Sequence, residues 1–427
     1  MNVLVVADDF TGAMDTGYGF AADGRAVRVV LSEPTSGTDR ESFEIHDSES
    51  SESTDVLTID VDTRDVSPET ARKTVSNTLD PNCPLVYKKV DSTLRGNVVP
   101  EVDGAIDAID ADIAVVAPAF PSTGRVTANG VHLVDGIPLA DAGYNVPESN
   151  LRTIFDPSRY RVSTLGVETV VQGSDAVRSA LASEVSSNPT IVACDAVHDR
   201  HLATIASGAQ SLDATVLFVG SGGLASAVSV PGSDNRTPCL DAPDGNILAV
   251  VGSVNEATLK QLEAVSAEYI YSLDSAAAVR EPVRVGRGAA TALADRLAEH
   301  GCAVITATTE PSAVERANEA ATDLRGDIDA GARVASALAA ATTEVSERAP
   351  LSSLFLTGGS TARAVLESVS ATEIELTGTL VGDGIPEGRI CDGEFAGTRV
   401  VTKAGGFGTE GSILNCLTYL GNIDERN

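Results

Sequence analysis

Three carboxylates stand close together near the start of the chain, where a strand should lead into a helix. Asp8 and Asp9 follow the apolar run Val3–Val6, and Asp15 comes after a Thr-Gly turn. A short apolar run of this kind is typical of a strand inside a parallel sheet, and open α/β sheets bind ligands beyond the carboxyl ends of their strands. A single aspartate there would most simply cap the next helix. Three of them favour a site for a polar ligand whose hydroxyl groups donate to carboxylates.

Two further segments place mixed charges after an apolar run. Lys88–Asn97 (KKVDSTLRGN) combines cations, an acid, hydroxyls and an amide, and a later segment that follows Ile113–Ala117 ends in Arg125. Arginine can hold a carboxylate or phosphate through two parallel hydrogen bonds, whereas lysine supplies a point charge. These segments predict a site for a small acidic sugar. The candidate contacts are Asp8, Asp9, Asp15, Lys89, Asp91, Ser92, Arg95, Asn97 and Arg125.

Glycine and hydroxyl residues replace this charged pattern in the second half. Three turns follow apolar runs, namely Gly252-Ser253, Thr357–Ala362 (TGGSTA) and Lys403–Gly408 (KAGGFG). Glycine lets the backbone approach a phosphate closely, and free N–H groups at the start of a helix bind anions. The turns predict a nucleotide site, although simple helix starts would give the same pattern. No P-loop sequence occurs, and we expect no dinucleotide site at Gly406–Gly411 because too few residues follow its GxGxxG match for a βαβ unit.

The elements that must position these loops alternate along the chain. Strands are predicted at Val27–Leu31, Val56–Ile59, Leu85–Tyr87, Ile113–Ala117, Ile191–Ala193, Val216–Val219, Ile247–Val251, Ala303–Thr306, Leu354–Leu356 and Val400–Thr402. Helices are predicted near Ser67, Val98, Arg200, Gly223 and Asn255 and over Ala330–Val345. The alternation predicts an α/β fold of two domains, each a mainly parallel sheet flanked by helices.

The domain boundary is predicted where proline, glycine and aspartate gather. Pro231–Gly245 has this composition, which divides the chain into an N-terminal sugar-acid-binding domain (1–230), a linker (231–245) and a C-terminal nucleotide-binding domain (246–427). The acid- and serine-rich segment Glu33–Asp55 predicts a solvated loop.

The composition limits the classes of partner. The 427 residues are 43% hydrophobic and carry a formal net charge of −31, which repels nucleic acid and anionic lipid. The sequence has neither an apolar stretch long enough to span a membrane nor the pattern of a signal peptide. Six scattered cysteines without a CxxC pair predict buried, reduced thiols. We therefore expect a cytoplasmic protein with small-molecule partners, and a homodimer stays open.

The order and spacing of the motifs resemble those of the four-carbon acid sugar kinases. The resemblance rests on ADDFTGAMD (Ala7–Asp15), KKVDSTLRGN (Lys88–Asn97), PAFPSTGR (Pro118–Arg125), DGIPL (Asp135–Leu139), GSGGLA (Gly220–Ala225), Gly252-Ser253, TGGSTA (Thr357–Ala362) and KAGGFG (Lys403–Gly408). It implies an ATP- and Mg²⁺-dependent kinase that phosphorylates the C4 hydroxyl of threonate, erythronate or a 3-oxo-tetronate. It also implies that the N-terminal domain binds the sugar acid and the C-terminal domain binds ATP.

The resemblance also implies roles for single residues. It assigns ATP contacts to Ser253, Gly358, Gly359, Ser360, Thr361 and Gly405, and the local pattern adds Lys403. Arg95, Arg125 and Lys89 would hold the carboxylate or the transferring phosphoryl group. Asp9 is the favoured group to orient or deprotonate the attacking oxygen, and no metal ligands can be assigned.

One departure and two alternatives keep the function open. After DGIPL, family members continue with Glu-Thr-x-Phe and an Asp, whereas this chain has Ala140–Asn145 (ADAGYN), which leaves the exact substrate open. GSGGLA fits an anion-binding turn and a packing turn equally well. A non-catalytic sensor that binds a sugar acid and a nucleotide is the alternative function, and a nicotinamide-dependent dehydrogenase is disfavoured by the misplaced GxGxxG.

The excess of acids predicts a salt-adapted, halophilic protein. The chain has 61 acids and only 30 bases. The excess carboxylates repel one another across the surface, which opposes the compact state. Raising KCl from about 0.1 to about 1 M shortens the Debye length from about 10 to about 3 Å. We expect the melting temperature and kcat/KM to rise together across this range. A flat or falling melting temperature would show that the acidic surface is not an adaptation to salt.

Overall fold

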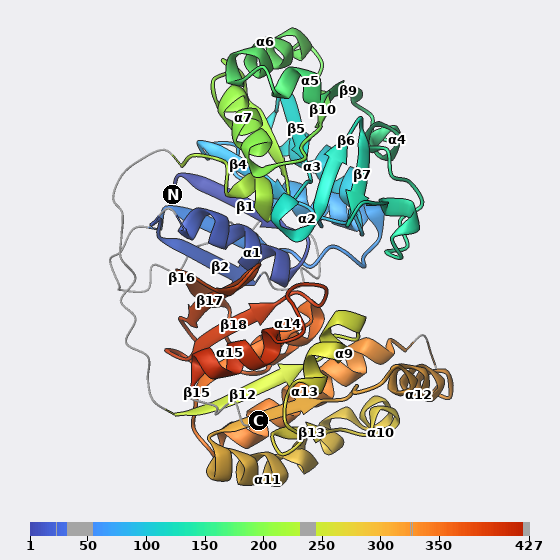
Figure 1. Cartoon of the computed structure of the whole chain (residues 1–427), viewed down its shortest axis with the longest axis vertical. Coiled ribbons are helices and arrows are strands. Elements are labelled where there is room, and N and C mark those ends of the chain that lie inside the picture. Colours follow the sequence, from blue (N-terminus) through green and yellow to red (C-terminus); the bar gives the residue numbers. More distant parts are fainter. Residues whose placement is uncertain (23, 32–53, 231–244, 325, 327, 422–427) are drawn as a thin grey trace. The chain divides into compact units, whose positions relative to one another are not determined.

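The computed structural model describes residues 1–22, 24–31, 54–230, 245–324, 326 and 328–421. The chain divides into two compact units, Met1–Thr237 and Pro238–Asn427, and each is a mainly parallel sheet flanked by helices (Figure 1). The α/β prediction is confirmed for both. Apart from their last residues, the predicted loop Glu33–Asp55 and the predicted linker 231–245 lie outside the described residues. The predicted domain boundary therefore stays a prediction.

The described strands of the first unit form a parallel sheet in the order β2-β3-β1-β4-β11-β5-β10-β9. Their bounds are β1 Val3–Ala7, β2 Val27–Leu31, β3 Val56–Asp60, β4 Leu85–Lys89, β5 Ile113–Ala117, β9 Arg161–Leu165, β10 Thr190–Cys194 and β11 Val216–Gly220. The central strands are buried along their whole length, because helices cover both faces of the sheet. β1 and β5 are uninterrupted apolar runs, which the sequence predicts well, whereas β3 and β4 end in charged residues.

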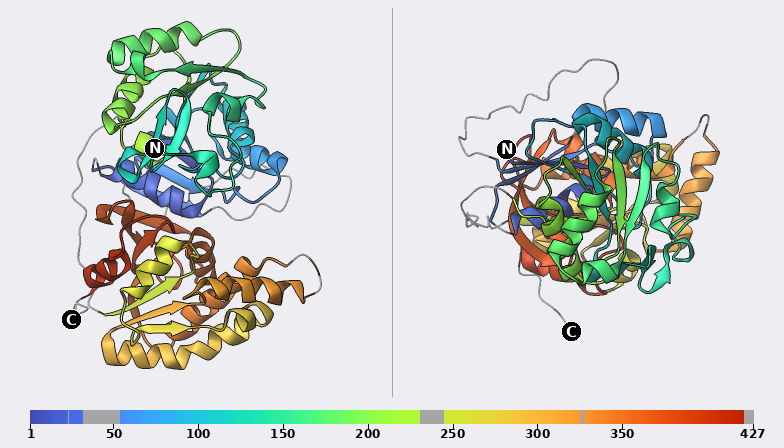
Figure 2. Two further views of the ribbon diagram at one scale, coloured as in Figure 1. Left: turned by 45° about the vertical axis from the view of Figure 1, so that its right-hand side comes forward. Right: turned by 90° about the horizontal axis from the view of Figure 1, so that it is seen from above.

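Two sets of helices cover this sheet (Figures 1 and 2). On one face α2 (Pro68–Thr78) and α3 (Val98–Ile109) pack against each other and bury Leu4 and Val6 of β1. On the other face lie α1 Phe10–Ala21, α5 Val167–Val170, α6 Ser174–Glu184, α7 Asp199–Gln210 and α8 Gly222–Ala225, which contact one another in turn.

A small antiparallel sheet is attached to the first unit and was not predicted. It consists of β6 (Arg125–Ala128), β7 (Val131–Val134) and β8 (Ile137–Pro138). Two short 3-10 helices, Pro121–Thr123 and Leu139–Asp141, flank it, and α4 (Leu151–Phe155) follows. This sheet positions Arg125 and the loop that departs from the family pattern.

The second unit has a sheet of the order β13-β14-β12-β15-β18-β17-β16. The bounds are β12 Asn246–Val251, β13 Ile270–Ser272, β14 Cys302–Thr306, β15 Leu351–Thr357, β16 Glu373–Gly382, β17 Ile385–Ile390 and β18 Arg399–Lys403. All neighbours up to β18 are parallel, whereas β17 pairs antiparallel with both β16 and β18, a hairpin that was not predicted.

Helices cover both faces of the second sheet as well. On one face α9 (Glu256–Glu263) and α15 (Ser412–Leu420) pack over β12 and β15. The other helices are α10 Ser275–Arg280, α11 Pro282–His300, α12 Pro311–Thr322, α13 Ala330–Ser346 and α14 Gly359–Ser368. Among these, α13 packs against both α11 and α14, and α10 packs against α12.

In each unit the chain changes its direction of winding beside the first strand. In the first unit β1 leads through β2 to β3 on one side, and the chain then passes to β4 on the other side of β1. In the second unit β12 lies between β14 and β15 in the same way. The helices that follow the two adjacent strands depart to opposite faces, and ligands of open α/β sheets bind at such switch points. The topology therefore points to one site at the ends of β1 and β4 and another at the ends of β12 and β15.

The helix predicted near Gly223 is confirmed and is the four-residue α8. Two details of the predictions need correction. The strand predicted at Leu85–Tyr87 extends to Lys89, so Lys88 and Lys89 are strand residues. The cysteines are not all buried, since Cys391 is exposed and Cys83 is half-buried. Within the described residues, no helix combines the length and apolarity needed to cross a membrane.

Candidate active site

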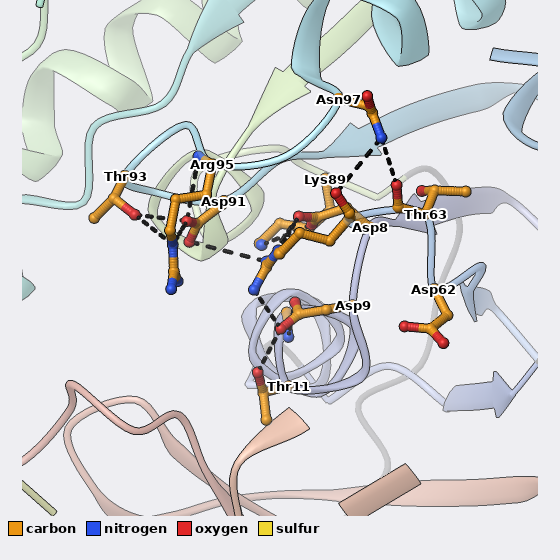
Figure 3. Close-up of polar contacts among 12 residues, drawn as sticks. Asp8, Asp9, Thr11, Asp62, Thr63, Lys89, Asp91, Thr93, Arg95 and Asn97 are labelled. Carbon is orange, nitrogen blue, oxygen red and sulfur yellow. Dashed lines mark hydrogen bonds and ion pairs between the residues drawn. The ribbon is translucent and has the colours of Figure 1, made fainter. Parts of the chain in front are cut away.

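An arginine that was not predicted joins the acids at the switch point of the first unit. Arg64 lies in the loop after β3, and its Nε and Nη2 donate to Asp8 at 3.0 and 2.7 Å. Its Nη1 lies 2.9 Å from Asp9, and its Nη2 lies 4.0 Å from Asp91. Lys89 Nζ is 3.6 Å from the other oxygen of Asp8. Figure 3 shows Asp8, Asp9, Lys89 and Asp91 gathered at this point. Charges of opposite sign thus alternate across the site.

The cations keep the buried acids ionised. Burial by itself would raise the pKa of Asp8, but Arg64, Lys89 and Lys88 outweigh it and hold that pKa below its usual value. Burial would also raise the pKa of Asp91, but Arg64 and Arg95 hold that pKa well below the usual range. At neutral pH the site therefore presents fixed charges of both signs, which suits a ligand that carries hydroxyl groups as well as an anion.

Asp9 caps α1 and also takes part in the charge network. Its Oδ1 accepts from the backbone N–H of Gly12 at 2.9 Å, and its Oδ2 accepts from the Thr11 hydroxyl at 2.9 Å. A Cβ added to Gly12 would lie 2.5 Å from Lys89 Nζ and 2.6 Å from Asp9 Oδ1. Glycine is thus required for the lysine ammonium to approach the start of α1. The capping role is present, while the predicted role of Asp9 in the reaction stays a prediction.

The loop after β4 presents Arg95. Asp91 Oδ2 accepts from the Thr93 hydroxyl at 2.6 Å and from Arg95 Nε. The Arg95 side chain is nevertheless 44% exposed, so its remaining donors can reach a ligand. The next residue, Gly96, has a φ of +84°, and a Cβ there would lie 2.9 Å from Cγ of Arg64. The turn therefore packs directly against the arginine that joins the acids.

A buried layer behind the charges fixes the loop that carries Arg64. Lys88 is fully buried, and its Nζ lies 3.0 Å from Glu101, which in turn accepts from the Thr63 hydroxyl at 2.6 Å. Asn97 Nδ2 donates to the carbonyls of Thr63 and Val66 at 2.8 and 2.9 Å. These contacts position the loop after β3. Because its amide nitrogen is engaged in this way, the sugar contact predicted for Asn97 stays a prediction.

Ser92 and Arg125 lie where the small antiparallel sheet meets the loop after β4. The Ser92 carbonyl accepts from His132 Nε2 at 2.8 Å, and His132 Nδ1 accepts from the Thr127 hydroxyl at 2.9 Å. Burial lowers the pKa of His132 to about 4, so the ring is neutral and holds one fixed tautomer. Arg125 is buried and donates through Nη1 to the Thr123 carbonyl, while Nη2 lies 3.4 Å from the Tyr144 hydroxyl.

Asp15 lies apart from the ion pairs, on the side of α1 that faces α8. It is buried, and a Cβ added to Gly222 would lie 2.4 Å from its Oδ2. Burial raises the pKa of Asp15 to about 7; nearby Lys89 opposes the shift and Asp9 adds to it. Since this folded-state pKa lies above the ordinary value, the protonated form favours folding, and that stability is lost as the pH rises through about 7.

Replacing Asp15 with asparagine should remove this pH dependence. The amide cannot ionise. We therefore expect the melting temperature of Asp15→Asn to rise relative to that of the wild type as the pH rises from about 5 to about 8. The corresponding change in the free energy of unfolding is at most a few kcal/mol. Thermal unfolding at constant ionic strength measures the difference. Asp107→Asn, which alters an acid paired with the exposed Arg72, serves as the control. A difference that stays constant with pH would mean that Asp15 does not titrate in this range.

In the second unit three glycine turns meet around Ser253. Gly358 has a φ of +96°, and a Cβ there would lie 3.1 Å from the backbone nitrogen of Ser253. A Cβ on Gly405 would lie 2.2 Å from the Ser253 Oγ. A Cβ on Gly252 would lie 1.9 Å from the Thr361 Oγ1. The structure thus brings together the predicted residues Ser253, Gly358, Thr361 and Gly405, with the glycines packed closely against the backbone and hydroxyl of Ser253 and the hydroxyl of Thr361.

The start of α14 completes this arrangement. Gly359 and Ser360 are its first two residues, and the first N–H groups of a helix have no partner within the helix. Such groups, together with the helix dipole, favour a phosphate. Asn255 caps α9 from the neighbouring turn by accepting from the Ala257 N–H at 2.9 Å. Two helices therefore begin beside the glycine turns.

Lys403 holds one of the turns. It is fully buried, and its Nζ donates to the carbonyls of Ala404, Gly405 and Phe407 at 3.1 to 3.2 Å and to the Thr258 hydroxyl at 3.2 Å. An ammonium group has three protons, so these four acceptors occupy it fully. Lys403 thus fixes the shape of the turn, and its predicted contact with ATP stays a prediction.

The residues that sequence reasoning missed are mainly Arg64, Thr63 and Glu101. The first two follow the strand Val56–Asp60 in the run Asp60–Arg64 (DVDTR), which has the same pattern of an apolar strand ending in charged residues. Glu101 is an acid inside a predicted helix and gives no such signal. No cluster of three or more His, Cys, Asp or Glu side chains suited to a metal ion occurs among the described residues.

Comparison with known families finds a match in each of the two units. The family of sugar-binding N-terminal domains matches residues 3–228, and the family of nucleotide-binding C-terminal domains matches residues 248–413. A D-threonate kinase of Salmonella typhimurium is 31% identical, with 98% of each chain covered. A D-erythronate kinase of Heliobacterium modesticaldum is also 31% identical, covering 98% of this chain and 97% of the relative. A 3-oxo-tetronate kinase of Brucella melitensis is 26% identical over 77% of each.

Two solved structures share the fold. A protein of Salmonella typhimurium LT2 superposes with a TM-score of 0.76 at 22% identity, covering 97% of this chain and 98% of the other. A protein of Haemophilus influenzae superposes with a TM-score of 0.68 at 20% identity, covering 98% and 100%. The α/β architecture described above is therefore one that has been observed experimentally.

Proposed function

The chain belongs to the four-carbon acid sugar kinase family, and on that premise we propose that it transfers the γ-phosphoryl group of ATP to the terminal (C4) hydroxyl of a four-carbon sugar acid. Threonate, erythronate and 3-oxo-tetronate are the candidate substrates. The observation that carries the proposal is the pairing of two switch-point sites of different chemistry. The site of the first unit presents fixed charges of alternating sign, and the site of the second unit is lined by glycine backbone.

The charged site suits the sugar acid. Arg95, Arg125 and Lys89 supply cations for the carboxylate or the phosphoryl group, and the acids Asp8, Asp9, Asp15 and Asp91 accept hydrogen bonds from hydroxyl groups. Asp9 is the group we assign to orient the C4 hydroxyl and accept its proton, because it stands at the exit of β1 with 14% of its side chain exposed. Arg64 keeps Asp8 ionised and pairs with Asp9, which holds both carboxylates in place.

The glycine-lined site suits the phosphates of ATP. Ser253, Gly358, Gly359, Ser360, Thr361 and Gly405 offer backbone N–H groups and hydroxyls at two helix starts. Phosphoryl transfer depends on positioning and charge neutralisation more than on covalent chemistry, so rigid turns of this kind are appropriate. Lys403 keeps one turn rigid from behind.

Magnesium would accompany the nucleotide. This ion keeps most of its waters and is usually held by substrate phosphates with one or two carboxylates, rather than by a cage made wholly of protein. The described residues offer no such cage, which agrees with an ion delivered on ATP. We assign no protein ligand to it.

A screen for ADP release tests the proposal. Purified protein in molar KCl would be given MgATP and, separately, D-threonate, D-erythronate and their 3-oxo forms. We expect at least one acid to stimulate ADP release well above the rate with ATP alone. If an acid raises the melting temperature but ATP is never consumed, the chain is a sensor that binds both ligands without catalysis.

A further inference from the structure

The loop Ala140–Asn145, which departs from the family pattern, directs one aromatic side chain toward the charged site. Gly143 and Asn145 have φ angles of +81° and +56°, so the residue between them sits in a sharply turned backbone. Exposure alternates along the loop: Asp141, Gly143 and Asn145 are exposed, whereas Ala142, Tyr144 and Val146 pack against the core of the first unit. The turn therefore directs the ring of Tyr144 inward.

Tyr144 contacts two arginines that arrive from different parts of the fold. The guanidinium carbon of Arg95 lies 5.7 Å from the centre of its ring, within the range of a cation–π contact. Its hydroxyl lies 3.4 Å from Nη2 of Arg125. Arg95 belongs to the loop after β4, whereas Arg125 begins β6 of the antiparallel sheet. One side chain thus links the two elements that supply these cations.

Each arginine is also held from another side. Arg95 is tied to Asp91 and to the Thr93 hydroxyl, and Arg125 is tied to the Thr123 carbonyl. These bonds fix each guanidinium to its own loop but do not connect the two loops. Tyr144 contacts both guanidinium groups, and its ring occupies volume beside them.

We infer that Tyr144 is the specificity-determining residue of the sugar-acid site, which limits the acceptor to acids of four carbons by the volume that its ring fills beside Arg95 and Arg125. This inference rests on the proposed function. A shorter aliphatic side chain would free the volume of the ring. An acid with one more carbon could then be accommodated.

Two substitutions separate the ring from its hydroxyl. Tyr144→Phe keeps the ring under Arg95 and removes only the contact with Arg125, so we expect KM for the tetronate to rise roughly 5-fold, as for one long hydrogen bond. Tyr144→Leu removes the ring, and we expect the preference in kcat/KM for a four-carbon over a five-carbon acid to fall at least about 10-fold. KM for ATP should not change in either variant.

A second tyrosine provides a matched control. Tyr160 also has an arginine over its ring, Arg159 at 5.1 Å, and its hydroxyl also bonds to a charged partner, Asp107. Tyr160→Phe and Tyr160→Leu should leave the preference for chain length unchanged. The phenylalanine variant at Tyr144 should retain the preference, which would separate a role in selectivity from general damage to the fold.

The outcomes distinguish this inference from the proposed function. If the wild type phosphorylates a four-carbon acid and Tyr144→Leu shows the wild-type ratio of kcat/KM for the two chain lengths, the inference is overturned and the kinase activity stands. If the wild type phosphorylates no sugar acid, the proposed function fails and the inference fails with it. A selective loss of chain-length preference in Tyr144→Leu supports both.

Discussion

Replacing Arg95 with alanine should lower kcat/KM for the sugar acid by at least about 100-fold, or roughly 2.7 kcal/mol of transition-state stabilisation. The Arg95 side chain pairs with Asp91 but remains 44% exposed, so we expect it to contribute more to ligand binding than to the fold. Ion pairs with this degree of exposure contribute little to stability. We therefore expect the melting temperature to change by only a few degrees while kcat/KM for the sugar acid falls by at least about 100-fold.

The chain offers a closely matched control for Arg95. The side chain of Arg72 is also 44% exposed and also pairs with an aspartate, Asp107, but it lies on α2 outside the charged site. Arg72→Ala should leave kcat/KM near the wild-type value. Equal losses in the two variants would mean that general charge, rather than a contact at the site, explains the effect of Arg95.

Asp9→Asn tests the acid of the same site by the same assay. Asparagine caps a helix about as well as aspartate, so α1 keeps its start while the negative charge is lost. We expect a loss in kcat/KM of similar size, at least about 100-fold. A variant that unfolds but retains activity per folded molecule would show that Asp9 only caps the helix and pairs with Arg64.

Gly405→Val should raise KM for ATP by at least about 30-fold, or roughly 2 kcal/mol, without changing KM for the sugar acid. The added Cβ would lie 2.2 Å from Ser253 Oγ, and the turn that Lys403 holds from behind cannot withdraw from it. Ser253 must then leave its place in the nucleotide site. Kinetics with ATP varied at saturating sugar acid would measure the effect.

Another glycine of the second unit controls for the substitution itself. A Cβ on Gly288, in α11, would meet nothing within 4 Å, so Gly288→Val should be close to neutral in both KM values. If Gly405→Val leaves KM for ATP unchanged while the protein remains folded, the nucleotide binds elsewhere.

The sequence was sufficient to predict the parallel cores and the ends of their strands. β1, β5 and β12 lie under helices on both faces, so Val3–Ala7, Ile113–Ala117 and Ile247–Val251 are uninterrupted apolar runs. The antiparallel pair β16 and β17 was missed because β16 is only partly buried and its pairing shifts register twice. Glu373–Leu376 alternates polar and apolar residues, but Gly378 and Gly382 interrupt the pattern.

The composition of the site was predicted less completely than its location. Arg64 becomes a neighbour of Asp8 only because β3 lies beside β1 in the sheet, and strand order cannot be read from the order of strands in the chain. Lys88 and Lys89 are adjacent in a strand and therefore point to opposite faces, so only one could reach the acids of β1. Both are buried; Lys89 approaches Asp8, whereas Lys88 pairs with Glu101 on the other face.

Lys403 shows a limit of another kind. A lysine after a strand and before a glycine turn is equally consistent with a phosphate ligand and with an internal brace. Only the four oxygen atoms around its ammonium group distinguish the two. The sequence contains no sign of this arrangement, because three of the acceptors are backbone carbonyls.

The most direct test of the central claim is the chemical identity of the product. The protein would be incubated in molar KCl with MgATP and the sugar acid that best stimulates ADP release, and the product would be analysed by phosphorus–proton correlation NMR. We expect one phosphate monoester whose phosphorus couples to the C4 methylene protons, formed in equal amount to ADP. Release of inorganic phosphate alone, or a phosphorus atom coupled to another carbon position, would contradict the claim that this chain phosphorylates the terminal hydroxyl.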